Sequence, residues 1–290
     1  MKINQNIKLY LKGILMGICD LIPGISGGTI AFITGIYERF ITAIKNITIK
    51  NYFELFILII KWKKNKIIKK INDLDIIFLI ILFLGIFSAI FSGAHLISYL
   101  LENYPALLFA FFIGLIITST LSIHKHIKIH TTKNYIFAGL GFLFGLSLFF
   151  VTERTIEEPN FFYVFLGGAI AVCALFLPGI SGSFILLIMG LYKYIVNQVK
   201  NINTSYLNLI PFIVGAIVGM YLISRTVNYL FKKDKCKTLY TLIGLIIGTL
   251  IIPINLTYIN SINFNLVQYF ILINIFLFGI LLGFILDKIK

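Results

Sequence analysis

Six apolar segments of this 290-residue chain are each long enough to cross the hydrocarbon core of a lipid bilayer. A helix needs about 17–25 mostly apolar residues for that crossing. The segments are residues 76–101, 104–123, 135–152, 207–231, 238–254 and 267–286. Soluble domains carry about 25% charged residues, whereas charged residues make up 12% of this chain and apolar residues 59%. We therefore predict an all-α polytopic membrane protein.

A motif occurs twice in the chain. Residues 20–39 read DLIPGISGGTIAFITGIYER and residues 175–194 read LFLPGISGSFILLIMGLYKY, an offset of 155 residues. A weaker echo at an offset of 130 relates Gly85 to Gly215, and it places His95 opposite Arg225. The pattern indicates a duplication within a single membrane domain, with repeat one at 1–152 and repeat two at 161–290.

Each motif lies in a region with two shorter apolar arms, such as 29–44, around a Gly-rich loop. We predict that both regions, 7–45 and 161–199, are re-entrant hairpins that return to the side from which they enter. In that topology 20 of the 25 basic residues face the cytoplasm, together with both termini. A single crossing at the first motif would put the Lys61–Lys70 cluster outside, against the positive-inside rule.

This topology has a consequence for symmetry. Each repeat is a hairpin plus three transmembrane helices, and an odd number of crossings inverts the second repeat relative to the first. Two inverted-topology repeats are the architecture of many secondary transporters.

The segment 52–73 is expected to be an amphipathic interfacial helix. Its basic stretch KWKKNKIIKK, residues 61–70, suits anionic headgroups. The simpler interpretation is a topology determinant, and a regulatory or partner-binding role is the alternative. The net charge of +14 is concentrated in such short loops, which disfavours nucleic acid as a partner.

The motif loops are the candidate binding site. Unwound backbone at membrane depth is costly unless it lines a cavity or is buried in protein. Pro23 and Pro178 end the first arms, and Ser26 and Ser181 are placed to cap the second arms. Two helix N-termini facing each other suit an anion, phosphate above all; the alternative is that small residues only allow close packing. The predicted phosphate-binding residues are Gly24, Ser26, Gly27, Gly28, Thr29, Gly179, Ser181, Gly182, Ser183, Arg225 and His95.

Charged residues near the loops have two interpretations each. Arg225 lies inside a span and either binds phosphate or extends to the interface. His95 either binds phosphate, carries a proton or packs in a span. Asp20 is either a proton-coupling group or a local loop cap. Glu38 and Arg39 serve either coupling or gating, or form an interfacial ion pair.

No metal site, cofactor or enzyme activity is predicted. His124, His126 and His130 cluster without an acidic or cysteine ligand nearby. The three cysteines show no metal or redox spacing. No Walker loop, nucleophile elbow or paired-carboxylate site is recognisable.

The segments MGICDLIPGISGGTIAFITGIYERFI, residues 16–41, and LPGISGSFILLIMGLYKYI, residues 177–195, resemble the bacterial polyprenyl-phosphate transporter family of the PopT type. The resemblance covers nearly the whole chain. It implies a flippase in the bacterial cytoplasmic (inner) membrane that returns undecaprenyl phosphate from the outer to the cytoplasmic leaflet for cell-envelope polymer synthesis. Proton or membrane-potential coupling would involve Asp20 or His95. The family's motif residues match Asp20, Pro23, Gly24, Ser26, Gly27, Gly28, Glu38, Arg39, Pro178, Gly179, Ser181 and Gly182.

Lys193 departs from this pattern, since many relatives are expected to have an acid there. Two other functions stay open. A carrier of a small soluble anion would use the same central site without apolar grooves that reach the lipid. A membrane enzyme acting on lipid phosphates would need a catalytic cluster.

Overall fold

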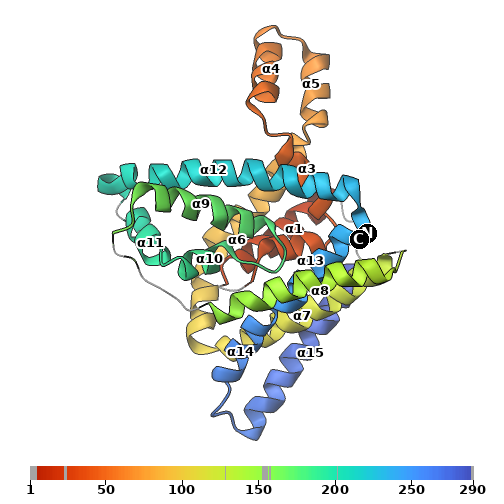
Figure 1. The fold of residues 1–290 in the computed structure, drawn as a ribbon, viewed down its shortest axis with the longest axis vertical. Coiled ribbons are helices and arrows are strands. Elements are labelled where there is room, and N and C mark those ends of the chain that lie inside the picture. The colour runs from red at the N-terminus through yellow and green to blue at the C-terminus, as the bar shows by residue number, and fades with distance from the viewer. Residues whose placement is uncertain are drawn as a thin grey trace.

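The computed structural model describes residues 5–22, 25–127, 129–151, 156, 158–200 and 202–288, and this part of the chain is helical without β-strands (Figure 1). The first half contains α1 (Gln5–Asp20), α2 (Gly27–Ile33), α3 (Tyr37–Lys45), α4 (Ile49–Ile60), α5 (Lys64–Asp73), α6 (Ile76–Asn103), α7 (Pro105–His126), α8 (Thr132–Ser147) and a 3-10 turn at Leu148–Phe150. The second half contains α9 (Phe161–Phe176), α10 (Gly182–Ile188), α11 (Tyr192–Lys200), α12 (Ile202–Lys233), α13 (Lys235–Thr249), α14 (Ile251–Ile259) and α15 (Leu266–Lys288).

Six helical stretches of the described chain are long and apolar enough to cross a membrane. Large apolar side chains cover their outer surfaces, as at Phe91, Leu266 and Phe270, which are 83%, 89% and 68% exposed. Such a surface is stable against lipid and not against water. The predicted all-helical class is confirmed, and the apolar helices agree with a multi-pass membrane protein. The six stretches are Ile76–Gly93, Pro105–Lys125, Thr132–Phe150, Tyr206–Lys233, Lys235–Ile259 and Leu266–Ile285.

Four pairs of helices make the main contacts: α1 with α6, α9 with α12, α8 with α13, and α7 with α15. Each pair packs backbone against backbone at glycines. A Cβ built on Gly13 would clash with the carbonyl of Leu82, and a Cβ on Gly244 would clash with the carbonyl of Ala138. Small residues hold membrane helices together in this way, because lipid supplies no hydrophobic force between them.

The second arm of each motif region is broken. The arm predicted at 29–44 is two helices, α2 and α3, and the corresponding arm of the second motif is α10 and α11. Gly35 and Gly190 lie at the breaks with φ of 75° and 73°, a left-handed conformation that ends a helix and favours glycine. The chain therefore turns at this glycine within the second arm of each motif region.

The predicted interfacial helix is also two helices. Trp62, with φ 49°, lies between α4 and α5, and the pair projects from the helix bundle (Figure 1). Lys70 of α5 binds Glu54 of α4 at 2.5 Å. This hydrogen bond holds the pKa of the exposed Glu54 carboxyl below its ordinary value. Large apolar side chains of α4, including Phe53 and Phe56, remain exposed, so the pair is amphipathic as a unit.

Candidate functional site

The two motif regions touch each other inside the bundle. The backbone N–H of Gly179 donates to the hydroxyl of Thr29 at 2.7 Å. The hydroxyl of Tyr37 donates to the carbonyl of Phe176 at 2.9 Å, and the Ser26 hydroxyl makes a longer bond of 3.4 Å to the carbonyl of Leu175. The structure thus brings together two segments that the sequence separates by about half its length.

The first motif loop is organised around the start of α2. Ser26 lies in extended backbone conformation, and its side chain accepts the N–H of Gly28 at 3.1 Å. Asp20, the last residue of α1, accepts the N–H of Gly27 at 2.7 Å. A Cβ on Gly27 would lie 2.6 Å from the Asp20 carboxylate, so this approach requires glycine. Gly24, a predicted phosphate ligand, lies with Pro23 outside the described residues.

Asp20 therefore caps the loop in this structure, and its role as a proton-coupling group stays a prediction. The N-terminus of a helix attracts anions because its first N–H groups are unpaired and its dipole end is positive. At α2 a carboxylate of the same chain already occupies this place. Lys12, two turns earlier on α1, donates to the carbonyl of Thr34 at 2.9 Å, where α2 ends. One helix thus holds both ends of α2, and all seven residues of α2 are buried.

The second motif loop has a different chemistry. The hydroxyls of Ser181 and Ser183 lie 2.8 Å apart, and the Ser181 side chain makes no capping bond to the helix backbone. Gly179 has φ 92°, and a Cβ there would lie 2.7 Å from the hydroxyl of Thr249. Gly182 is also tightly placed, because its Cβ would lie 2.7 Å from the carbonyl of Ala171.

At the offset of 155 residues, Leu175 corresponds to Asp20. At the C-terminal end of α10, a neutral hydroxyl makes the bond that a lysine makes at the end of α2. Tyr163 donates to the carbonyl of Met189 at 2.9 Å. In the first half, Lys12 makes the equivalent hydrogen bond to the carbonyl of Thr34. The first short helix is therefore held by charged side chains and the second by neutral ones.

The space between the loops is nearly closed. Its volume is about 10 Å³, and Ser26, Thr29, Gly179 and Thr249 are among its lining residues. Such a cavity holds about one water molecule. The arrangement seen here therefore leaves no room for a phosphate group at the loops, and binding there requires the two motifs to separate.

Arg225 and His95 do not join this cluster. The guanidinium of Arg225 contacts Tyr221, which lies one turn earlier on its own helix. Its guanidinium lies 3.5 Å from the centre of the Tyr221 ring and donates to the Tyr221 carbonyl at 3.3 Å. His95 is exposed on α6. Neither of the two is positioned to bind an anion at the loops in this conformation.

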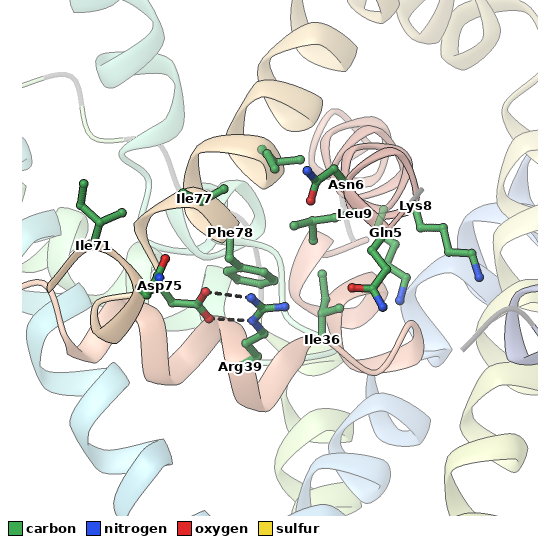
Figure 2. A pocket seen from close by; sticks show the side chains of 13 residues that line it. Gln5, Asn6, Lys8, Leu9, Ile36, Arg39, Ile71, Asp75, Ile77 and Phe78 are labelled. Atoms are coloured by element: carbon green, nitrogen blue, oxygen red, sulfur yellow. Dashed lines mark hydrogen bonds and ion pairs between the residues drawn. The ribbon is translucent and has the colours of Figure 1, made fainter. Parts of the chain in front are cut away.

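Glu38 and Arg39 form ion pairs, but not with each other. Glu38 binds Lys235 at 2.5 Å, which joins α3 to the start of α13. Arg39 binds both carboxylate oxygens of Asp75, at 2.6 and 2.8 Å (Figure 2). The sequence suggested ion pairs at this point, and the partners are distant along the chain.

The sequence did not predict an apolar groove that lies beside the second motif. It has a volume of about 700 Å³ and reaches Leu177, the residue before Pro178. The helices α8, α12 and α13 form its walls. Its lining residues are Phe137, Leu140, Gly141, Phe144, Leu177, Val227, Leu230, Lys233, Asp234, Lys237, Thr238, Thr241, Leu242 and Leu245.

One end of the groove is charged. Lys237 binds Asp234 at 2.7 Å, and its hydrogen bonds hold the pKa of Asp234 below the ordinary value. Lys233 adds a further cation. An apolar channel with a cationic end is suited to an amphiphile that has an anionic head. The sequence signal was present in the short basic connection at 232–237, which by itself only indicated orientation.

No cluster of three or more potential metal ligands from His, Cys, Asp and Glu occurs among the residues that the structure describes.

Comparison with known proteins adds sequence relatives. A family model described as "VCA0040-like: Undecaprenyl phosphate translocase-like" matches residues 16–265. A polyprenyl-phosphate transporter from Vibrio cholerae serotype O1 is 37% identical over 246 residues, which cover 84% of this chain and 76% of the relative. A polyprenyl-phosphate transporter from Staphylococcus aureus is 29% identical over 296 residues, 96% of this chain and 95% of the relative. No solved structure matches.

Proposed function

The chain belongs to the VCA0040-like, undecaprenyl phosphate translocase-like family, and from that premise we propose that it transports a polyprenyl phosphate across the membrane. The substrate is undecaprenyl phosphate, and the direction is from the outer to the cytoplasmic leaflet, where the carrier lipid serves cell-envelope polymer synthesis again. The location is the bacterial cytoplasmic membrane, with both termini in the cytoplasm. The family and the two relatives are named for transport or translocation and not for catalysis.

The observation that carries this proposal is the groove between α8, α12 and α13. A prenyl tail is a long hydrocarbon, and it is most stable where it stays out of water. The groove offers an apolar path that starts at Lys233 and Lys237 and ends at Leu177, beside the Pro-Gly turn. A carrier for a small soluble anion gains nothing from such a groove, so its presence favours a lipid substrate.

The proposed mechanism is alternating access by two inverted repeats. The contacts support this symmetry, because α1 packs on α6 as α9 packs on α12. Likewise α8 packs on α13 as α7 packs on α15. The first two contacts lie within one half each, whereas the last two join the halves with the partners exchanged, as two-fold related repeats require. Rocking of one half against the other would open the space between the motifs to each leaflet in turn.

The phosphate is proposed to bind the motif residues when they separate, at Ser26, Gly27, Gly28, Thr29, Gly179, Ser181, Gly182 and Ser183. Three hydrogen bonds, from Gly179, Tyr37 and Ser26, close the site here. Each contributes roughly 0.5–1.5 kcal/mol net. Together they amount to a few kcal/mol, which is within what a ligand with higher affinity for the open state can offset.

The charged residues have separate roles in this proposal. Asp20 competes with an entering phosphate for the N–H of Gly27, which makes it the candidate for coupling. The Glu38–Lys235 pair links the first hairpin to the second half and serves as a gate, while Arg39 is held at Asp75. Arg225 and His95 reach the phosphate only after the helices move.

The direct test is native mass spectrometry of the purified protein with undecaprenyl phosphate, in competition with undecaprenyl pyrophosphate and phosphatidylglycerol. The Leu230→Gln variant places an amide in the groove and should weaken binding of the monophosphate lipid. Leu222→Gln is the matched control, because Leu222 lies on the same helix, is 54% exposed and does not line the groove. Binding no tighter than that of phosphatidylglycerol would contradict the proposed substrate, and equal effects of both variants would remove the groove from the mechanism.

A further inference from the structure

A second large pocket, drawn in Figure 2, shares no lining residue with the groove or with the small space between the motif loops. Its volume is about 680 Å³, within the range of small-molecule sites. It is formed by the first turns of α1, the link between α2 and α3, and the junction of α5 with α6. Its lining residues are Gln5, Asn6, Lys8, Leu9, Lys12, Ile36, Arg39, Ile71, Asn72, Asp75, Ile77, Phe78 and Ile81.

The charges that line this pocket are mostly positive. Lys8, Lys12 and Arg39 come from two different helices and converge on it, and Asp75 is the acid among the lining residues. Asp75 is engaged by the guanidinium of Arg39. The pocket therefore keeps an excess of positive charge beside an apolar wall.

Arg39 is held in a geometry that suits a phosphate. Its Nε and one terminal nitrogen bind Asp75, and its guanidinium lies 4.3 Å from the centre of the Phe78 ring. Figure 2 shows the remaining terminal nitrogen turned away from Asp75, to the side where Gln5 and Lys8 lie. A guanidinium fixed in this way offers N–H donors to a second anion without losing further side-chain entropy.

Lys12 connects the pocket with the first hairpin. Lys12 is one of the lining residues, and its ammonium donates to the carbonyl of Thr34 at the end of α2. Asp20, on the same helix α1, holds the other end of α2. An anion that draws Lys12 toward it would therefore act on the helix that begins at the motif loop.

We propose that this pocket is a second binding site for the phosphate monoester head of the lipid, on the side of the protein predicted to be cytoplasmic. This inference rests on the proposed function, since it gives the head group a position to occupy after it leaves the loops. The apolar wall of Leu9, Ile77 and Ile81 lies beside the cations, so the first prenyl units contact it while Lys8, Lys12 and Arg39 bind the phosphate.

The test uses a cysteine reporter in the full chain in lipid nanodiscs. Cys19, Cys173 and Cys236 are first replaced by alanine, and Asn72→Cys then places a thiol at the rim of the pocket. Asn65→Cys is the matched control, because Asn65 is an exposed asparagine of the same helix that does not line the pocket. The rate of reaction with a charged maleimide is measured with and without undecaprenyl phosphate, inorganic phosphate or phosphatidylglycerol.

Undecaprenyl phosphate should slow labelling of the Asn72→Cys variant and leave the Asn65→Cys variant unchanged. Adding Lys8→Gln should raise the lipid concentration needed for protection about tenfold, as expected for the loss of one charge-assisted contact. Lys50→Gln, which removes an exposed cation outside the pocket, should leave it unchanged. Both variants replace partly or fully exposed side chains and are expected to fold.

Two results would overturn this inference alone. One is equal protection by inorganic phosphate or phosphatidylglycerol, because the pocket would then not select a lipid phosphate monoester. The other is absence of protection in protein that native mass spectrometry shows to bind undecaprenyl phosphate, and this result leaves the proposed function intact. Loss of undecaprenyl phosphate binding in the mass spectra would instead overturn the proposed function, and the lipid assignment of the pocket with it.

Discussion

The N–H of Gly179 donates to the hydroxyl of Thr29 at 2.7 Å, and this bond joins the two motif loops across 150 residues of sequence. It is the shortest of the three hydrogen bonds that hold the loops together. Both partners belong to the Gly-rich motifs themselves. The two copies of the motif are therefore in direct contact with each other, and this contact provides the first test of their role.

Thr29→Val should destabilise the closed contact. Valine keeps the shape of threonine but leaves the N–H of Gly179 without an acceptor, at a cost of roughly 1–3 kcal/mol. Hydrogen exchange at residues 177–183 should increase, and the midpoint of thermal unfolding in detergent should fall. Thr257→Val is the control, because Thr257 donates to Pro253 within its own helix. An unchanged exchange rate at the second loop would contradict the importance of the contact.

Asp20 can be tested by separating its charge from its hydrogen bond. Asp20→Asn keeps an oxygen that can accept the N–H of Gly27, so its stability should stay near that of the parent protein. Asp20→Ala removes the acceptor and should lower the free energy of unfolding by about 0.5–2 kcal/mol. If Asp20 also couples transport to protons, the folded Asp20→Asn protein should lose uptake of undecaprenyl phosphate in liposomes. Full activity of that variant would restrict Asp20 to capping.

The Glu38–Lys235 pair should act on gating more than on stability. Both side chains are more than half exposed, and exposed pairs contribute about 0–1 kcal/mol. Glu38→Lys or Lys235→Glu should change the transport rate while the thermal midpoint moves little, and the double reversal should restore the rate. Transport by the double variant that stays as slow as in the single variants would show that the pair itself is not the gate.

The contact between α4 and α5 should depend on pH only in acid. Glu54 has a pKa below the ordinary value of 4.5, because it accepts a hydrogen bond from Lys70. A depressed pKa in the folded state gives stability that is present above the ordinary value and is lost as pH falls through the lowered one. Trp62, the single tryptophan of the chain, lies between the two helices and reports on them.

Its fluorescence should stay constant from neutral pH to about 5 and change only below about 4. In the Glu54→Gln variant this acid step should be absent. A transition near pH 6 would show that a different group controls the pair.

The sequence predicted the helical membrane class because the lengths of apolar segments are a local property. It also indicated where the backbone unwinds, since proline and glycine act on their own positions. It did not predict the breaks after α2 and α10, because a glycine inside an apolar arm is compatible with a continuous helix until packing selects the left-handed conformation. Gly35 and Gly190 show this choice.

The sequence also did not predict the partners of the charged side chains, because packing selects them too. Arg225 was expected near a phosphate, but its own helix provides Tyr221 one turn away, and the guanidinium stacks there. Glu38 and Arg39 are neighbours in sequence, but Glu38 binds Lys235 at the start of α13 and Arg39 binds Asp75 in the turn before α6. The groove was missed because its lining residues extend from 137 to 245 and share no pattern.

The unequal support of the two short helices has a consequence for the working cycle. Lys12 and Asp20 hold α2 by charge, whereas Gly167 and Leu175 occupy the corresponding places in the other half. Salt and the membrane potential act on charges and hardly on neutral hydroxyls. The two end states of a two-fold related carrier would then differ in energy before any lipid is bound. If the gene arose by duplication from identical halves, Lys12 and Asp20 of α1 would since have given the carrier a preference for one of its two end states.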